Sequence, residues 1–277
     1  MASITDLVVE GLKYPFNDIK KLLGCGVLFA LISVISVFMG VKSLGIFRAA
    51  AHAIEKTNGT APHLLFSQLP TADIYYLVVL AIITFVVSLF IMGYQYNILK
   101  FSIEKRADLP GFSDVVGIFV KGIKYFVVTI AYNIIPMLVL ACGIMVGNSP
   151  ILPIIILISM VLFIIAFFLL IMALNNMAAH DSLKKAFDFR EIMDIIANLG
   201  RGKYIGIILF TIIVNMIIMV SVGFILSGIT AIFTATVSNQ ALAVSVFIAL
   251  IQGLFVDSYS ALFLNRVYGS VYREAIN

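Results

Sequence analysis

The sequence predicts an all-α fold, a polytopic bundle of six transmembrane helices. The first observation is composition: of 277 residues, 62% are hydrophobic and 12% are charged, whereas a soluble domain is typically about half apolar and about a quarter charged. The second is continuity, because the apolar residues form unbroken runs instead of the alternation found in barrel strands. The third is that the lysines and arginines gather on one side of these runs. The chain is therefore an integral membrane protein.

Six apolar stretches are each long enough to cross roughly 30 Å of hydrocarbon as a helix of about 20 residues. They occupy residues 22–41, 74–99, 125–146, 151–174, 204–226 and 241–264. The first stretch is longer than the apolar core of a typical signal peptide and has no small-x-small cleavage site, so we expect it to remain in the membrane as an anchor.

The basic residues predict the orientation of these spans. Fifteen of the 18 lysines and arginines fall in the N-terminal segment, the second and fourth loops with their flanks, and the C-terminal tail. Only Lys42, Arg48 and Lys56 lie opposite, in the first loop. By the positive-inside rule we expect a multi-pass protein of the cell membrane with both termini cytoplasmic. The same asymmetry accounts for the net charge of +4, so the expected partner is the lipid bilayer and not nucleic acid.

The first outer loop differs from the other two in its length and polarity. Its segment IFRAAAHAIEK, residues 46–56, predicts a short helix that stops at Asn58-Gly59. Asn58-Gly59-Thr60 is also an N-x-[ST] sequon on the predicted outer side, which makes Asn58 a possible glycosylation site. A simple turn is the alternative explanation of the same residues.

Several scarce polar residues repeat at a shift of 80 positions. Ser102, Lys105, Asp108, Asp114, Lys121 and Gly122 fall on Ser182, Lys185, Asp188, Asp194, Arg201 and Gly202. The simplest repeated unit is a cytoplasmic amphipathic helix followed by a transmembrane hairpin. Three pseudo-repeats, about 1–107, 108–187 and 188–277, would then form a single integral membrane domain over residues 1–277.

Each predicted amphipathic helix has an acid that is followed seven positions later by a base. These interfacial acid–base pairs are Asp6 with Lys13, Asp114 with Lys121, and Asp194 with Arg201. An early acid and a late base suit the helix dipole, and the base would reach towards phosphate at head-group level. We interpret these segments as membrane-surface helices; a docking or gating element is the alternative.

Two segments resemble a known family. GLKYPFNDIKKLLGCGVLF, residues 11–29, contains Tyr14-Pro15-Phe16. GYQYNILKFSIEKRADLPGFSDVVGIFVKGIKYF, residues 93–126, contains the turn Leu109-Pro110-Gly111-Phe112-Ser113-Asp114. Both motifs are similar to those of the domain of unknown function 4013 family, multi-span membrane proteins of archaea and bacteria. The resemblance implies the membrane fold and carries no reaction, ligand or catalytic residue.

The usual motifs of catalysis and cofactor binding are absent from the sequence. It has no GxxxxGK[ST], HExxH, CxxC or GxSxG pattern, the short signatures of phosphate binding, zinc hydrolysis, redox chemistry and serine hydrolysis. We therefore predict no catalytic residue, no metal site and no cofactor.

Polar groups inside the spans are the informative residues, because they are costly in hydrocarbon. Asp257 is an acid well within the sixth span, and Asn133 and Asn215 are repeat equivalents in the third and fifth spans. All three lie roughly 8 to 11 positions from the cytoplasmic end of their span, about 12–16 Å deep. They are expected to meet as an intramembrane polar cluster, either as hydrogen bonds between helices or as a proton or solute site.

Three functional classes follow from these features. The first hypothesis is a non-enzymatic organising or accessory protein, whose partners would be other membrane proteins. The alternatives are a small-solute or lipid transporter with a polar site around Asp257, and a membrane-embedded lipid-modifying enzyme. An open cavity that reaches Asp257 would favour transport, and a packed, dry centre would favour the organising role.

Overall fold

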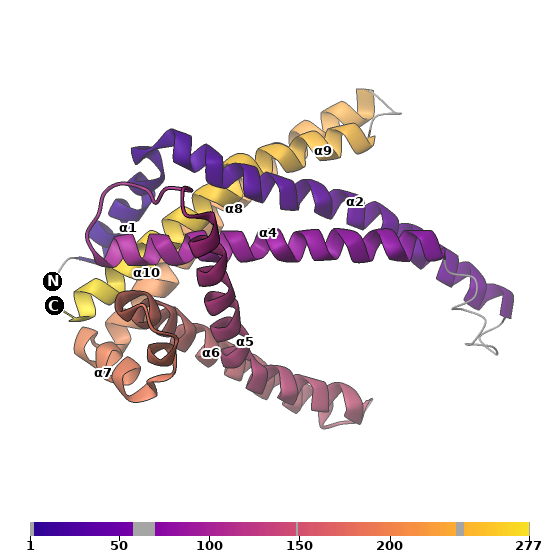
Figure 1. Cartoon of the computed structure of the whole chain (residues 1–277). Coiled ribbons are helices and arrows are strands. Elements are labelled where there is room, and N and C mark those ends of the chain that lie inside the picture. Colours follow the sequence, from indigo (N-terminus) through magenta and orange to yellow (C-terminus); the bar gives the residue numbers. More distant parts are fainter. Residues whose placement is uncertain (1–2, 58–69, 148, 237–240, 277) are drawn as a thin grey trace. The chain divides into compact units, whose positions relative to one another are not determined.

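A computed structural model of the chain describes residues 3–57, 70–147, 149–236 and 241–276. Every regular element within these ranges is a helix (Figure 1). The helices are α1 (Ile4–Lys13), η1 (Tyr14–Asn17), α2 (Ile19–Thr57), α4 (Thr71–Ile103), α5 (Val115–Val146), α6 (Leu152–His180), η2 (Leu183–Phe187), α7 (Phe189–Leu199), α8 (Arg201–Thr236), α9 (Ala241–Ile251), η3 (Gln252–Asp257) and α10 (Ser258–Ile276). The predicted all-α fold is confirmed.

The six predicted spans are confirmed as helices of sufficient length and hydropathy. Within the described residues, six helical stretches could cross a membrane: Ile19–His52, Thr71–Ile103, Val115–Val146, Leu152–His180, Arg201–Phe233 and Ala241–Ile276. The last combines α9, η3 and α10. The short helix expected over residues 46–56 is part of α2, which runs through it without a break. Asn58 lies outside the described residues, so its glycosylation stays a prediction.

The chain divides into two compact units, and neither is a continuous stretch of sequence. Unit 1 comprises Met1–Leu22, Leu89–Met219 and Tyr259–Asn277. Unit 2 comprises Leu23–Ser88 and Val220–Ser258. The division cuts across several long helices, because one part of α2, α4 and α8 packs in unit 1 and the other part packs in unit 2. This division does not test the three pseudo-repeats, which stay a prediction.

The core of unit 1 includes the apolar faces of two short helices. Leu7 and Val8 of α1 are buried, as are Ile192 and Ile196 of α7 together with the last residue of that helix, Leu199. All of them belong to one cluster of buried side chains. The apolar face that the helical spacing predicts for residues 192–199 is therefore confirmed. This face packs against other buried side chains of unit 1, and the location of α7 at the membrane surface stays a prediction.

The middle amphipathic segment is different from the prediction. We expected a separate surface helix over residues 112–121, but α5 runs unbroken from Val115 to Val146. By contrast, α7 is separated from α8 by Gly200, whose φ of +90° is left-handed backbone that glycine adopts readily. No glycine with positive φ interrupts α5, so the span begins directly at its N-cap.

Glycines allow α4 and α5 to approach closely within unit 1. A Cβ atom on Gly93 would lie 1.8 Å from the carbonyl oxygen of Ile118, and one on Gly122 would lie 1.8 Å from that of Leu89. Both clashes are with backbone, which cannot turn away as a side chain can. Small residues permit such backbone contact between membrane helices, so this crossing depends on both glycines.

Candidate functional site

The sixth span contains a wide turn at its acid. Gln252–Asp257 forms the π-helix η3, between the α-helices α9 and α10. A π-helical turn holds an additional residue within an α-helix and is frequent at functional sites. Its last residue is Asp257, the intramembrane acid that the sequence singled out.

Two neutral groups hold the Asp257 carboxylate. The Gln252 side chain donates a hydrogen bond from Nε2 to Oδ1 at 2.9 Å, and the Ser33 hydroxyl donates one to Oδ2 at 3.3 Å. Among the described residues, no lysine, arginine or histidine forms an ion pair with this carboxylate. Gln252 and Ser33 orient the carboxylate through neutral hydrogen bonds, and no described cationic side chain balances its charge.

Close backbone contact between α2 and η3 brings Ser33 to this acid. A Cβ atom on Gly26 would lie 2.2 Å from the carbonyl oxygen of Leu254, and one on Gly253 would lie 2.4 Å from the Cα of Ala30. These contacts and the Ser33 hydrogen bond follow α2 at intervals of three to four residues, the spacing of one helix face. All of these residues belong to unit 2.

A groove of about 540 Å³ lies beside Asp257 in unit 2. Polar side chains contribute to its lining from three helices and from η3: Ser33, Ser36, Ser227, Thr230, Ser245 and Gln252. Two of them, Ser33 and Gln252, are the donors to Asp257. We call this feature the polar groove. The polar groove is therefore one residue away from the Asp257 carboxylate, through the two side chains that donate to it.

The hydroxyl groups of the polar groove are satisfied without losing their capacity to accept. Ser36 donates to the carbonyl oxygen of Ile32, and Ser245 to that of Ala241, each at 2.8 Å. Such bonds use the hydroxyl proton and leave the oxygen lone pairs available. The polar groove therefore offers oxygen atoms to a cation or to a hydrogen-bond donor.

The other two members of the predicted polar cluster belong to unit 1. Asn133 donates to the carbonyl oxygen of Thr129 in its own helix at 2.8 Å. Asn215 accepts a hydrogen bond from Ser260 at 2.8 Å, which joins α8 to α10. Asp257 belongs to unit 2, so the cluster of all three residues stays a prediction. The contact between Asn215 and Ser260 is a hydrogen bond between two helices, one of the two roles that we expected for these polar residues.

None of the three interfacial acid–base pairs forms an ion pair among the described residues. Two of the acids begin helices instead. Asp6 completes a capping box with Ser3, and Asp114 accepts from the backbone N–H of Gly117 at the start of α5. The hydrogen bonds from Ser3 hold the pKa of Asp6 below its ordinary value. Asp194 lies in the middle of α7, so the three acids do not share one position relative to a helix start.

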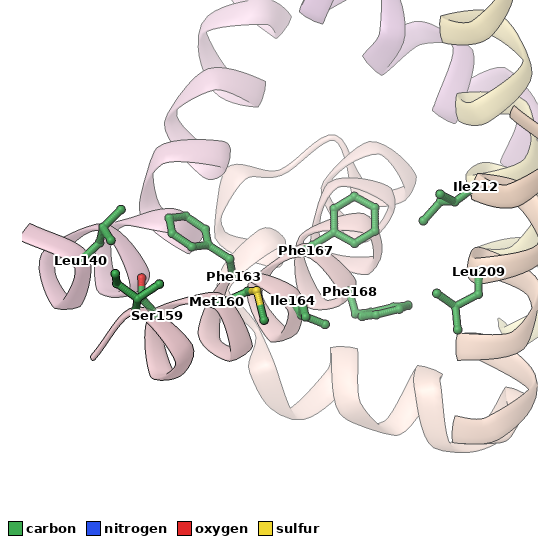
Figure 2. A pocket seen from close by; sticks show the side chains of 10 residues that line it. Leu140, Ser159, Met160, Phe163, Ile164, Phe167, Phe168, Leu209 and Ile212 are labelled. Atoms are coloured by element: carbon green, nitrogen blue, oxygen red, sulfur yellow. The ribbon is translucent and has the colours of Figure 1, made fainter. Parts of the chain in front are cut away.

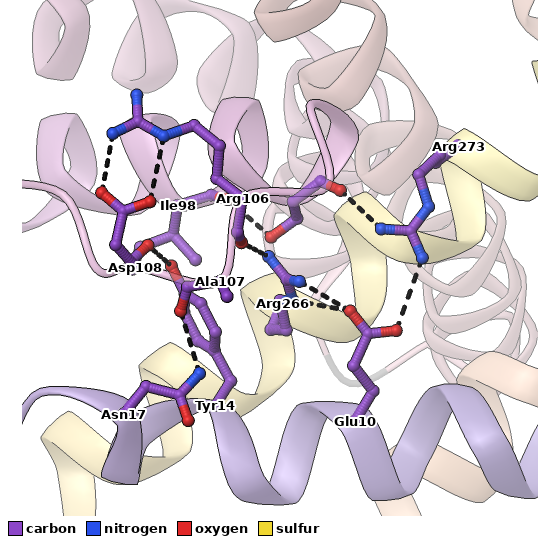
Figure 3. A network of polar contacts seen from close by, with 10 residues as sticks. Glu10, Tyr14, Asn17, Ile98, Arg106, Ala107, Asp108, Arg266 and Arg273 are labelled. Carbon is purple, nitrogen blue, oxygen red and sulfur yellow. Dashed lines mark hydrogen bonds and ion pairs between the residues drawn. The ribbon is translucent and has the colours of Figure 1, made fainter.

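A charged network in unit 1 was missed by sequence reasoning (Figure 3). Glu10 of α1 accepts hydrogen bonds from Arg266 and Arg273 of α10. Arg266 also donates to the carbonyl oxygen of Arg106 at 2.6 Å, and Arg273 donates to that of Ser102 at 2.9 Å. Both arginines had been counted only as cytoplasmic bases. Nothing in the sequence pairs them with an acid more than 250 positions away.

The segment after α4 is fixed to the same network. Asp108 forms two hydrogen bonds with Arg106, at 3.1 and 2.7 Å, and this guanidinium lowers the pKa of the Asp108 carboxyl. The Tyr14 hydroxyl donates to the carbonyl oxygen of Asp108, and the Tyr14 ring lies under the guanidinium of Arg266. Burial raises the pKa of Tyr14 to about 12. The family motif residue Tyr14 is thus a structural anchor.

No three His, Cys, Asp or Glu side chains of the described residues come together as a metal-binding group. The polar groove and the charged network are two of the polar assemblies among the described residues. The charged side chains of the network pair with one another, whereas the polar groove is open. The polar groove is therefore the candidate functional site.

The comparisons with known proteins agree with this picture of a membrane protein. Residues 76–227, more than half of the chain, match the family model described as a protein of unknown function, DUF4013. An uncharacterised protein of Methanocaldococcus jannaschii, MJ1189, is 26% identical over 284 residues, which covers 95% of this chain and 94% of the relative. No solved structure matches the chain. The match includes the turn at Leu109–Asp114 but not Tyr14-Pro15-Phe16. It covers two candidate spans completely and most of two others. The chain belongs to the DUF4013 family, whose function is unknown.

Proposed function

We propose that this protein moves a small cation, a proton included, across the membrane, with Asp257 as the group that binds it. The observation that carries the proposal is the position of the Asp257 carboxylate, whose two hydrogen-bond donors both line the polar groove. An open groove lined by both donors to Asp257 supports a transporter over a packed organising protein. We propose a cation as the solute because a carboxylate is negatively charged.

The energetic argument concerns the charge of this acid. An aspartate near the centre of a membrane helix costs about 2.5–3.5 kcal/mol to insert, and such residues usually mark ion or proton pathways. Ser33 and Gln252 orient the carboxylate, but neither is a cation. A proton or a small cation that enters along the polar groove would offset the charge at the moment of binding. Oxygen atoms along the groove suit a hard cation as well.

The predicted orientation gives the pathway a direction. With both termini cytoplasmic, α9 descends from the outer face and Asp257 lies deeper than Ser245 along the same span. The polar groove would then lead inward from the outer half of the membrane to Asp257. Release towards the cytoplasm would require a second arrangement of the helices, as alternating access does in transporters.

The test is ion flux in proteoliposomes with an entrapped pH-sensitive dye. Purified protein is reconstituted, and either a Na⁺ gradient or a K⁺ diffusion potential is imposed. We expect the wild type to shift the internal pH and Asp257→Asn, which keeps the size of the side chain, to abolish the shift. Asp73→Asn is the matched control, because Asp73 is another acid of unit 2 and is paired with Lys42 at 2.7 Å, outside the lining of the polar groove.

Each result decides between functions. Loss of flux in Asp257→Asn alone supports cation transport. Equal flux in the wild type and in Asp257→Asn overturns the role of Asp257. A wild type that shifts the internal pH under neither condition overturns proton transport and the exchange of Na⁺ for protons, and the organising or accessory role then becomes the better hypothesis.

A further inference from the structure

A second feature lies in unit 1 and is independent of Asp257. Two adjoining cavities, of about 580 and 700 Å³, lie between α6 and α8. Ile164, Phe168 and Leu209 line both of them, and we call the two adjacent cavities together the apolar groove. Figure 2 shows Phe168 of α6 on the side of that helix that faces Leu209 and Ile212 of α8.

The apolar groove has the length of a lipid chain. On α6 its lining extends from Ile156 to Leu169, about 20 Å at 1.5 Å per residue. One leaflet contributes about half of the roughly 30 Å hydrocarbon layer. A hydrocarbon chain of one leaflet therefore fits along the apolar groove. The lining side chains are almost all apolar, and the Ser159 hydroxyl is occupied by a hydrogen bond to the carbonyl oxygen of Pro136 at 3.0 Å.

A cation lies at one end of the apolar groove. Of the described residues, Arg201 at the start of α8 is the one charged residue that lines either cavity, and its side chain is exposed. Among the described residues it forms no ion pair with a carboxylate. A guanidinium binds phosphate oxygens through two parallel hydrogen bonds. An apolar channel that ends at an exposed arginine matches the two parts of a phospholipid.

The frame around this end is rigid. The Tyr204 hydroxyl donates to the carbonyl oxygen of Phe168 at 2.6 Å, and the two rings meet edge to face with centroids 6.0 Å apart. Tyr204 is buried, so these contacts fix α6 against α8 next to Arg201. Ile196 of α7, also buried, closes the wall beneath them. The apolar groove is thus held open by contacts that do not involve its occupant.

We propose that an anionic phospholipid occupies the apolar groove, with one hydrocarbon chain between α6 and α8 and its phosphate at Arg201. The charge of Arg201 selects anionic over zwitterionic head groups, and the apolar lining retains the chain. This lipid site would exist whether or not the protein transports cations, because the polar groove belongs to unit 2.

The experiment measures the lipids that stay bound to the intact protein. Protein is reconstituted in vesicles of phosphatidylcholine and phosphatidylglycerol, released in mild detergent and examined by native mass spectrometry. We expect the wild type to retain phosphatidylglycerol in preference to phosphatidylcholine. Arg201→Gln should reduce this preference about fivefold, the size expected for one interfacial arginine. Arg190→Gln is the matched control, because Arg190 is an exposed arginine of the preceding helix that lines neither cavity.

A second pair of variants tests the chain-binding part. Leu209→Trp fills the apolar groove and should reduce retention of both lipids. Ile213→Trp, one turn later on α8 and similarly exposed (53% against 47% for Leu209), should retain them. Equal preference in Arg201→Gln and Arg190→Gln overturns the phosphate site. Equal retention in Leu209→Trp and Ile213→Trp overturns the groove, and a poorly folded Leu209→Trp leaves the arginine pair to decide.

Discussion

The Arg266 guanidinium donates two hydrogen bonds to one oxygen of the Glu10 carboxylate, at 3.0 and 2.6 Å, across 256 positions of sequence. Arg273 reaches the other oxygen at 3.4 Å. The arginine side chains are only 5% and 9% exposed, and that of Glu10 is 35% exposed. One carboxylate therefore offsets two nearly buried cations, and it joins the first helix to the last.

Glu10→Gln is expected to destabilise unit 1. The change leaves the buried charge of Arg266 without a carboxylate, and breaking a buried pair in this way usually costs more than the pair contributes. Because Glu10 is partly exposed, we expect a loss of about 2–4 kcal/mol, less than for a fully buried pair. The free energy of unfolding in mixed detergent micelles, followed by far-ultraviolet circular dichroism, measures it.

Glu104→Gln serves as its control. Glu104 is an exposed acid of the turn that follows α4, so its change should alter the free energy of unfolding by less than about 0.5 kcal/mol. If the two variants have the same free energy of unfolding, the hydrogen bonds of the charged network do not stabilise the protein.

Gly93→Ala is expected to disturb the crossing of α4 and α5. The added methyl group would meet the backbone of Ile118, and overpacking of this kind typically costs about 1–3 kcal/mol. Gly206→Ala in α8 has open space around its Cβ, and it should be neutral or gain up to about 1 kcal/mol in helix propensity. Thermal unfolding of both variants in detergent compares them. Similar stability of Gly93→Ala and Gly206→Ala would mean that the helices separate easily at this point.

The pair of Tyr96 and Asp181 predicts a dependence of stability on pH. The Tyr96 hydroxyl donates to Asp181 at 2.7 Å, and this hydrogen bond, assisted by the charge of Lys100, lowers the pKa of the Asp181 carboxyl below its ordinary value of 3.8. The folded state therefore gains stability above that value and loses it as the pH falls through the lowered pKa. Asp181 is half exposed, so we expect only about 0.5–1 kcal/mol.

Tyr96→Phe removes this contribution. The variant should be less stable than the wild type at neutral pH, and the difference should shrink as the pH falls below 3.8. Tyr75→Phe, a change at a tyrosine that is 70% exposed, should have no effect at either pH. A stability difference for Tyr96→Phe that is independent of pH would assign the effect to packing instead of the carboxylate.

The orientation can be tested with single cysteines in a variant whose Cys25 and Cys142 are replaced by serine. Glu55→Cys, near the end of α2, should react with an impermeant maleimide added outside intact cells. Glu104→Cys and Asn198→Cys should react only after permeabilisation, because the positive-inside rule places both in the cytoplasm. All three positions are exposed. Labelling of Glu104→Cys or Asn198→Cys from outside would reverse the predicted topology.

The spans were predictable because each depends on a local property of the sequence. Whether a run of apolar residues is long enough to cross the membrane can be read from the run itself, and no distant residue alters that length. The buried face of α7 was predictable for the same reason, since Ile192, Ile196 and Leu199 follow helical spacing. The prominence of Asp257 followed from its rarity. These conclusions require no knowledge of which helices are neighbours.

The partners of Asp257 could not be predicted, because they depend on which helices are neighbours in the fold. Gln252 is a polar residue in an apolar run, five positions before the acid, and only the π-helical turn brings it within hydrogen-bond distance. Ser33 lies 224 positions away, and nothing in its neighbourhood distinguishes it from other serines of the first span. The close backbone contacts at glycines between α2 and η3 bring Ser33, and not another serine, next to Asp257. Backbone proximity of this kind is a property of the folded chain.

The division of unit 1 among three sequence segments has a consequence for biosynthesis. Its first segment ends at Leu22 and its last begins at Tyr259, so a ribosome must finish all the intervening spans before Arg266 exists to meet Glu10. During translation the nascent α1 holds an acid and an apolar face without their eventual cover. The contact between α1 and α10 can therefore form only after all the intervening spans have been synthesised.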